Sequence, residues 1–134
     1  MGVSESGETE EKRKMKELKM RILCNMSVVS YEDEKSEKGL WFLAEAEKIK
    51  KNARVSYLMS LNLEKSERCE EALSQIREAI RRGEMERVSE DVMRRYRVRE
   101  QELQRRVAEQ RRVEKRVYGK MLNGKLYWDK IAKK

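Results

Sequence analysis

The 134-residue sequence contains no proline and only six glycines. Proline and glycine are the two residues that most strongly destabilise the interior of a helix. Most of the remaining positions carry Glu, Lys, Arg, Leu, Met or Ala, which cost little free energy to place in a helix. The sequence therefore predicts an all-α fold, and at this length we expect a single domain.

Apolar periodicity places two helices in the first fifty residues. A stripe with spacings of three and four predicts a helix from about residue 10 to about residue 31. The stripe consists of Met15, Leu18, Ile22, Met26 and Val29. Ser36 followed by Glu37 is typical of a helix start, because serine can cap the helix and an acidic residue complements its dipole. A second helix is expected to run to about Lys50, with Asn52 in the turn that follows.

Two further helices are expected before Gly83. Apolar residues from Val55 to Leu63 predict a third, shorter helix that ends near Lys65. Ser66 repeats the cap signal and predicts the start of a fourth helix. Its inward residues are expected to be Cys69, Ala72, Leu73, Ile76, Ala79 and Ile80. Gly83 follows two arginines, and basic residues before a glycine are typical of a helix C-terminus, so the fourth helix is expected to end there.

The pattern then continues as one long helix from about residue 84 to about residue 122. Its apolar stripe is regular up to Val107, thin around Gln110 and clustered again at Val113, Val117 and Met121. A helix of about thirty-five residues spans roughly 50–60 Å, which is longer than a domain of this size is wide. The distal part of the long helix is therefore expected to project from the body.

The two ends of the chain differ from the helical domain, which is expected to cover residues 10–122. Residues 1–9 form an acidic leader with almost no apolar side chains, so we expect it to be disordered. Residues 123–134 form a basic tail, and its Leu126, Tyr127, Trp128 and Ile131 are expected to dock on the body. The acidic start does not resemble a secretory signal, and no apolar run is long enough to span a membrane. We therefore expect the cytoplasm, or alternatively the nucleus, and no membrane association.

The residue types argue against catalysis. The chain has no histidine, which removes the commonest general base and the usual partner of a serine or cysteine nucleophile. Cys24 and Cys69 stand alone, which is too little for a zinc site, and we expect both thiols to be buried and inert. No glycine-rich phosphate loop is present. We assign no catalytic residue, no metal site and no cofactor.

An internal repeat relates the two expected helix pairs. Five pairs of residues lie 33 positions apart and keep the same small or large character. They are Met26 and Met59, Ser27 and Ser60, Gly39 and Ala72, Leu43 and Ile76, and Ala46 and Ala79. Small residues at fixed positions allow close helix packing, so each half is expected to form one helical hairpin with these residues buried. The alternative is an irregular bundle in which common small residues match by chance.

This pattern resembles a degenerate tetratricopeptide repeat, which has a large–small pair in its first helix and Ala, Phe, Ala at fixed spacing in its second. Residues 23–122 resemble, more specifically, the last two repeats and extension helix of the immunophilin co-chaperones of the FKBP and cyclophilin types. The segment from Arg112 to Met121 resembles their basic helix end. The resemblance implies two hairpins followed by a long helix, with no isomerase activity because the isomerase domain has no counterpart here.

The same resemblance implies a candidate binding site. In that family, Lys, Asn and Arg side chains of a carboxylate clamp hold the acidic C-terminal tail of a chaperone. Asn25 matches the clamp Asn of the middle repeat, and Arg54 falls where the third repeat has its clamp Lys. Leu58 occupies the position of the clamp Arg, and the first repeat is missing. An ordinary exposed polar residue is the alternative interpretation of Asn25.

Two functions remain in competition. The first is a helical-repeat protein-interaction module that binds a peptide or helix, such as a chaperone tail or another acidic peptide, in a groove along the first helix of each hairpin. Its residues are Arg21, Asn25, Arg54, Tyr57 and Leu61. The repeat favours this function, because it is organised structure.

The second function is RNA or ribosome binding by the basic long helix. The net charge is +8, and residues 94–116 carry ten Lys or Arg against four Glu. The candidate contacts are Arg94, Arg95, Arg105, Arg106, Arg111 and Arg112. Pairs such as Glu102 with Arg106 and Glu109 with Arg112 are expected to neutralise part of this charge. A homomeric coiled coil is less favoured, because the heptad pattern breaks at Arg99 and Gln110.

Overall fold

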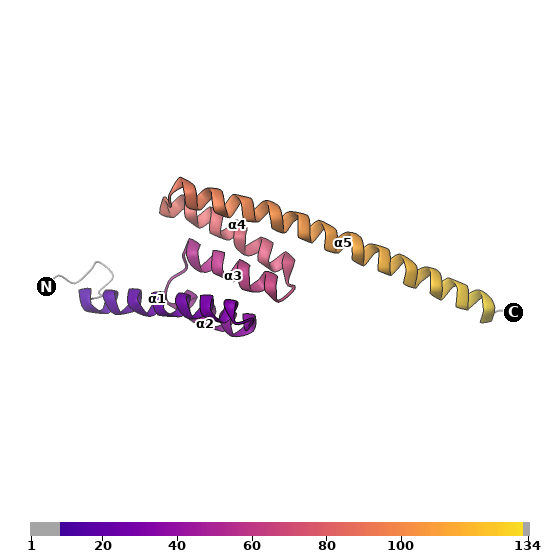
Figure 1. Cartoon of the computed structure of the whole chain (residues 1–134), viewed down its shortest axis with the longest axis horizontal. Coiled ribbons are helices and arrows are strands. Elements are labelled where there is room, and N and C mark those ends of the chain that lie inside the picture. The colour runs from indigo at the N-terminus through magenta and orange to yellow at the C-terminus, as the bar shows by residue number, and fades with distance from the viewer. Residues whose placement is uncertain (1–8, 133–134) are drawn as a thin grey trace.

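A computed structural model describes residues 9–132. Within this range the chain forms five helices and is all-α, as the sequence predicts (Figure 1). The helices are α1 (Glu10–Glu32), α2 (Ser36–Ile49), α3 (Ala53–Lys65), α4 (Cys69–Glu86) and α5 (Glu90–Ala132). The first four form two hairpins stacked through α2 and α3, and α5 packs on α4. The predicted architecture of two hairpins and a long helix is confirmed.

Both hairpins turn in the same way, 33 residues apart. Glu34 and Glu67 adopt the left-handed conformation, with φ of 63° and 61°. The next backbone N–H in each turn donates to the helix that precedes it, from Lys35 to the Ser30 carbonyl at 2.7 Å and from Arg68 to the Leu63 carbonyl at 2.9 Å. This is the pattern of a Schellman motif, which satisfies carbonyls at a helix C-terminus. The repeat therefore extends to the backbone of the turns.

The helix caps differ from the expected ones, and Asn52, expected in the turn after α2, is itself a cap. Asn52 caps α3, because its Oδ1 accepts from the Val55 N–H at 2.9 Å. The expected caps at Ser36 and Ser66 are wrong. Ser36 is the first residue of α2, and Ser66 is the C-cap of α3 rather than the N-cap of α4. α2 and α4 begin without a side-chain cap hydrogen bond, whereas the Schellman motifs satisfy carbonyls at the C-termini of α1 and α3.

The residue pairs of the repeat lie at equivalent places. Ser27 and Ser60 are both fully buried, and each hydroxyl donates to the carbonyl three residues earlier at 2.6 Å. Gly39, Ala72, Leu43, Ile76, Ala46 and Ala79 are buried as predicted. Met26 is the exception, since it is 43% exposed whereas Met59 is half-buried. The repeat is real, but the expected burial of Met26 is wrong.

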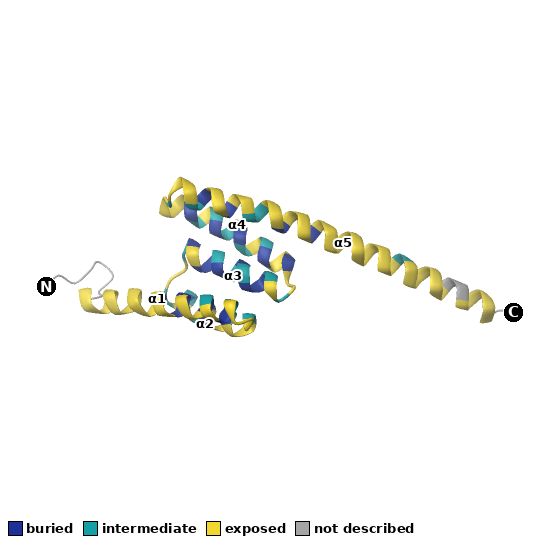
Figure 2. Ribbon diagram, viewed as in Figure 1, coloured by how far each residue is buried: buried dark blue, intermediate teal, exposed yellow. Residues whose placement is uncertain are grey.

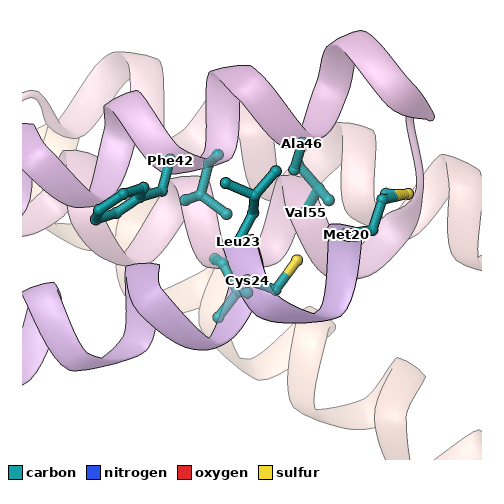
Figure 3. Packing of buried hydrophobic residues seen from close by; sticks show 8 residues of the cluster. Met20, Leu23, Cys24, Phe42, Ala46 and Val55 are labelled. Atoms are coloured by element: carbon teal, nitrogen blue, oxygen red, sulfur yellow. The ribbon is translucent and has the colours of Figure 1, made fainter. Parts of the chain in front are cut away.

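Two hydrophobic cores join the helices. The first contains buried side chains of α1, α2 and α3, namely Met20, Leu23, Cys24, Phe42, Leu43, Ala46, Val55 and Leu58 (Figure 3). The second joins α3 and α4 to α5 through residues that include Ile76, Ala79, Met93, Tyr96 and Leu103. The long helix is therefore part of the second core, as the sequence predicts.

The buried face of α1 differs from the expected one. Met20, Leu23, Cys24, Ser27 and Ser30 face inward. The stripe of Met15, Leu18, Ile22, Met26 and Val29 is 43–66% exposed. The helix carries apolar residues on both faces, and only the packing of α2 and α3 decides which face enters the core.

Gly83 does not end α4. The helix continues to Glu86, and the left-handed residue that follows is Arg87, with φ of 55°. Gly83 is buried, and a Cβ there would lie 2.7 Å from Sδ of Met93 and 3.1 Å from a methyl group of Val88. The glycine therefore allows α5 to approach α4 closely, which is a different use of the residue from the predicted helix stop.

The long helix projects as expected but does not end at residue 122. It starts at Glu90 and continues through Asn123 and Gly124 to Ala132. The last buried residue among those described is Val107, and the distal helix is almost entirely exposed (Figure 2). Trp128 and Ile131 are 67% and 43% exposed on this helix, so a separate docked tail is not formed by the described residues. The acidic leader lies outside them, except for Thr9.

Candidate partner-binding groove

The predicted groove begins with a polar contact between the two hairpins. A guanidinium nitrogen of Arg54 on α3 donates to Oδ1 of Asn25 on α1 at 3.3 Å. Both side chains are exposed. Arg21 is also exposed and lies one helical turn before Asn25. The fold therefore brings the first helices of the two hairpins together at the position where the sequence predicts the groove.

The other two predicted groove residues are partly used in packing. Tyr57 is half-buried, and its ring lies 5.0 Å from the ring of Tyr96 on α5, with an interplanar angle of 31°. Leu61 is half-buried against the first hydrophobic core. Leu58, at the position that the resemblance assigns to a clamp Arg, is buried in that core and is only 6% exposed. The groove thus lacks a cation at this position.

The first turns of α5 form a further wall that the sequence analysis did not assign to the groove. A hollow of about 400 Å³ lies between α3 and α5. Its lining consists of Tyr57, Asp91, Arg94, Arg95, Val98, Arg99 and Glu102. The sequence did contain an indication of this wall. The long helix follows the second hairpin at the place where the first helix of another repeat would stand. The candidate site accordingly consists of the Asn25 and Arg54 contact between α1 and α3 and the neighbouring hollow between α3 and α5.

The charged side chains of the groove are mainly arginines. Arg21, Arg54 and Arg95 have no carboxylate within ion-pair distance in the part of the chain that the structure describes. Arg94 contacts Asp91 at 3.4 Å, and Arg99 binds Glu64 at 2.7 Å. Three cations are therefore left to interact with a negatively charged ligand.

The predicted basic surface on α5 has a different role over much of its length. Arg106 binds Glu64 at 2.6 Å and lies 3.6 Å from Glu67, so the expected pairing with Glu102 is wrong. Arg111 binds Glu70 at 2.9 Å. The expected pair of Glu109 and Arg112 is present at 2.9 Å. Tertiary ion pairs thus attach α5 to the end of α3, the turn that follows it and the start of α4.

Glu64 is the centre of this attachment. Its burial acts to raise the pKa of the carboxyl, but the hydrogen bonds and positive charges of Arg106 and Arg99 together outweigh burial and lower it. Of the six basic residues that the sequence singled out, only Arg95 and Arg105 have no ion pair within residues 9–132. The free positive charge of the proximal long helix is therefore smaller than its composition suggests.

The cysteines offer no reactive centre. Cys24 and Cys69 are 3% and 4% exposed, and burial raises the pKa of both thiols. Within the described residues, no group of three or more Cys, Asp or Glu side chains could hold a metal ion. No helix of the same range is both long enough and apolar enough to cross a membrane.

Comparisons of the chain with protein-family models, with curated proteins and with solved structures found no match. Functional interpretation therefore depends on the groove itself.

Proposed function

We propose that this chain is a non-catalytic helical-repeat module that binds an acidic peptide or helix of another protein in the groove over α1, α3 and α5. The observation that carries the proposal is the contact of Arg54 with Asn25, which joins the first helices of both hairpins and leaves the guanidinium charge uncompensated. A peptide carboxylate would complete the hydrogen bonding of such a guanidinium, and a bond of this kind is charge-assisted.

The resemblance to immunophilin co-chaperones gives this proposal its more specific form. A chaperone tail that ends in an acidic peptide would place its terminal carboxylate near Asn25 and Arg54. Because Leu58 replaces the clamp Arg and is buried, one charge-assisted contact is missing. Each such contact contributes about 1.5–3 kcal/mol, so we expect a dissociation constant of roughly tens of micromolar or weaker.

Titration of a fluorescent acidic peptide into the full chain tests the proposal. The peptide should bind with its C-terminal carboxylate free and lose most of its affinity when that end is amidated. Arg54→Glu should weaken binding roughly tenfold or more, because it removes a charge-assisted hydrogen bond and adds a like charge. Lys130→Glu, on the distal end of α5, is the matched control with the same change in net charge. Equal affinities of the two variants would contradict groove binding.

A second candidate function is RNA or ribosome contact. Arg95 and Arg105 on the proximal part of α5, and Lys115, Arg116 and Lys120 on its projecting part, have no ion pair among the described residues. Phosphate contacts release counterions, so this binding should fall steeply with salt. It should be insensitive to Arg54→Glu and weakened by joint reversal of Arg105 and Arg116. Peptide binding to the groove should instead show a shallow salt dependence.

A further inference from the structure

The most prominent unexplained surface of the molecule is the apolar stripe on α1. It consists of Met15, Leu18, Ile22, Met26 and Val29, and each of these side chains is between 43% and 66% exposed. The stripe continues into a hollow of about 360 Å³ between α1 and α2. Ile22, Met26 and Val29 line this hollow together with Phe42 of α2. Exposed apolar surface of this continuity is typical of an interaction site.

The internal repeat shows what kind of surface this is. A shift of 33 residues takes Ile22, Met26 and Val29 to three positions of α3 that are covered by the first hairpin. These positions are Val55 and Asn62, which are 0% and 1% exposed, and Met59, which is half-buried. Gly39 of α2 lies so close to Asn62 that an added Cβ would be 2.4 Å from its Oδ1. On α3 this face is packed against α2. The equivalent stripe on α1 is therefore a face on which another helix can pack.

The stripe is longer than its counterpart on α3. Helix α1 has 23 residues whereas α3 has 13, and the additional residues lie at the N-terminal end of α1. Met15 and Leu18 extend the stripe along these additional turns. A helix that follows the whole stripe would span about four turns, since the stripe covers residues 15 to 29. The surface therefore fits an amphipathic helix better than a short extended peptide.

Charge indicates the chemistry of the missing helix. Lys12 and Lys19 lie on one side of the stripe and Lys14 and Arg21 on the other, because residues seven apart share a helix side. Lys35 and Lys38 line the hollow at its far end, with Asp33 as the acidic residue there. In the described part of the chain, none of these six cations has an ion pair. A complementary helix would be apolar on one face and acidic along its edges.

We propose that the α1 stripe binds an acidic amphipathic helix of a partner protein. The occupant takes the place that α2 takes on α3, with its apolar face on Met15 to Val29 and its acidic edges beside the flanking lysines. A second copy of this chain fits less well. The exposed apolar residues Val113, Val117 and Met121 of its α5 are bordered by Arg116 and Lys120 on one side and by Glu114 and Lys125 on the other, so they offer no continuous acidic edge to the cations of α1.

Binding of designed helical peptides to the full chain tests this proposal. The first peptide carries leucines at helical spacing with glutamates on its edges, and the second carries the same leucines with lysines on its edges. We expect fluorescence anisotropy to show saturable binding of the acidic peptide only. Absence of binding at about 100 μM, or equal binding of both peptides, would overturn the proposal.

Substitutions within the stripe separate its apolar and charged parts. The double variant Ile22→Ser and Met26→Ser should weaken the acidic peptide roughly tenfold or more, because two apolar contacts are lost. The matched control is Val113→Ser with Val117→Ser, at positions of similar exposure on α5, and it should leave affinity unchanged. Lys14→Glu with Lys19→Glu should shift the preference toward the lysine peptide. Circular dichroism verifies that all variants remain folded, and an equal loss in the control would contradict the assignment.

Two further measurements test the other possible occupants of the stripe, which are a membrane surface and a second copy of this chain. Vesicles that contain anionic phospholipid should not bind the chain in a way that depends on Ile22 and Met26, whereas such dependence would assign the stripe to a membrane surface instead. Sedimentation should give the same oligomeric state for the wild type and the Ile22→Ser, Met26→Ser variant. A dimer that this variant dissociates would make a second copy the occupant and overturn the proposal. Arg95→Glu, in the hollow between α3 and α5, should leave binding of the acidic peptide to the stripe within about twofold.

Discussion

The two hairpins have the same turns and the same small-residue contacts, but they differ in what covers their outer faces. In the second hairpin, α2 packs on α3 and α5 packs on α4. In the first hairpin, α2 is covered by α3, while the stripe on α1 is exposed in the described chain. Met26 and Met59 occupy equivalent positions, yet the first is exposed and the second half-buried. In a stacked helical array, burial is thus decided by the neighbouring unit as much as by the repeat itself.

Removal of α5 should have the largest effect on stability. Without α5, the outer face of α4 would be exposed, as the stripe on α1 is. A chain that ends at Arg87 loses the buried side chains of Met93, Tyr96, Leu103 and Val107. Each contributes about 1.5–3 kcal/mol when fully buried, and their sum is comparable with the whole stability of a small domain. We expect no cooperative thermal transition by circular dichroism. A chain that ends at Lys115 keeps all four and should melt as the full chain does; a cooperative 1–87 fragment would contradict the expectation.

The equivalent positions Gly39 and Ala72 should respond in ways that sharpen the comparison. Gly39→Ala places a methyl group against the Asn62 carboxamide and should destabilise by about 1–3 kcal/mol through overpacking. The measurement is urea unfolding. Oδ1 of Asn62 is buried without a hydrogen-bond partner, so Asn62→Ala should relieve the contact and the double variant should be more stable than the sum of the single losses.

Ala72→Gly is the control for this pair, since the second hairpin already accommodates an alanine. It should destabilise by about 1 kcal/mol, as expected for glycine in a helix interior. If Gly39→Ala instead stabilised the protein, as helix propensity alone predicts, the close approach of α2 to Asn62 would be disproved.

Lowering the pH should destabilise the second hairpin more than the first, because Glu64 of α3 loses its charge. Burial acts to raise the pKa of this carboxyl, but the hydrogen bonds and charges of Arg106 and Arg99 together lower it below the ordinary 4.5. Folding therefore favours the ionised form, and its contribution to stability is complete above about pH 4.5 and is lost as the pH falls through the lowered pKa. Glu64→Gln should reduce the free energy of unfolding at neutral pH by about 1–2 kcal/mol.

The stability difference between the wild type and Glu64→Gln should shrink as the pH is lowered toward about 3. Urea unfolding at several pH values measures it. Glu114→Gln, an exposed residue without an ion pair in the described chain, should show little effect at any pH. A pH-independent loss in Glu64→Gln would mean that packing, rather than charge, attaches α5 at this residue.

The smallest expected effect separates the two repeat methionines. Met26→Ser should change stability by less than about 0.5 kcal/mol, because the side chain is exposed. Met59→Ser should cost about 1–2 kcal/mol, because the side chain packs against both cores. Thermal unfolding of the free protein distinguishes them. Equal losses would show that the α1 stripe is covered in solution.

The sequence alone predicts much of this architecture because its signals are local and periodic. The lack of proline and the spacing of apolar residues predict helices, and the 33-residue offset predicts two equivalent hairpins. The projection of α5 follows from its length. In the candidate site, the neighbourhood of Asn25 and Arg54 also follows from the repeat, because equivalent helices lie side by side in a stack.

The tertiary structure decided what local signals leave open. α1 has apolar residues on two faces, and the choice between them depends on where α2 and α3 pack. In the sequence, Gly83 is equally compatible with a helix C-terminus and with a close contact between helices. Only the packing of α5 on α4 shows that it serves the close contact. Arg106 has acidic neighbours along its own helix, yet the fold brings Glu64 within 2.6 Å. Each choice depends on residues distant in sequence, whose proximity exists only after the hairpins have stacked.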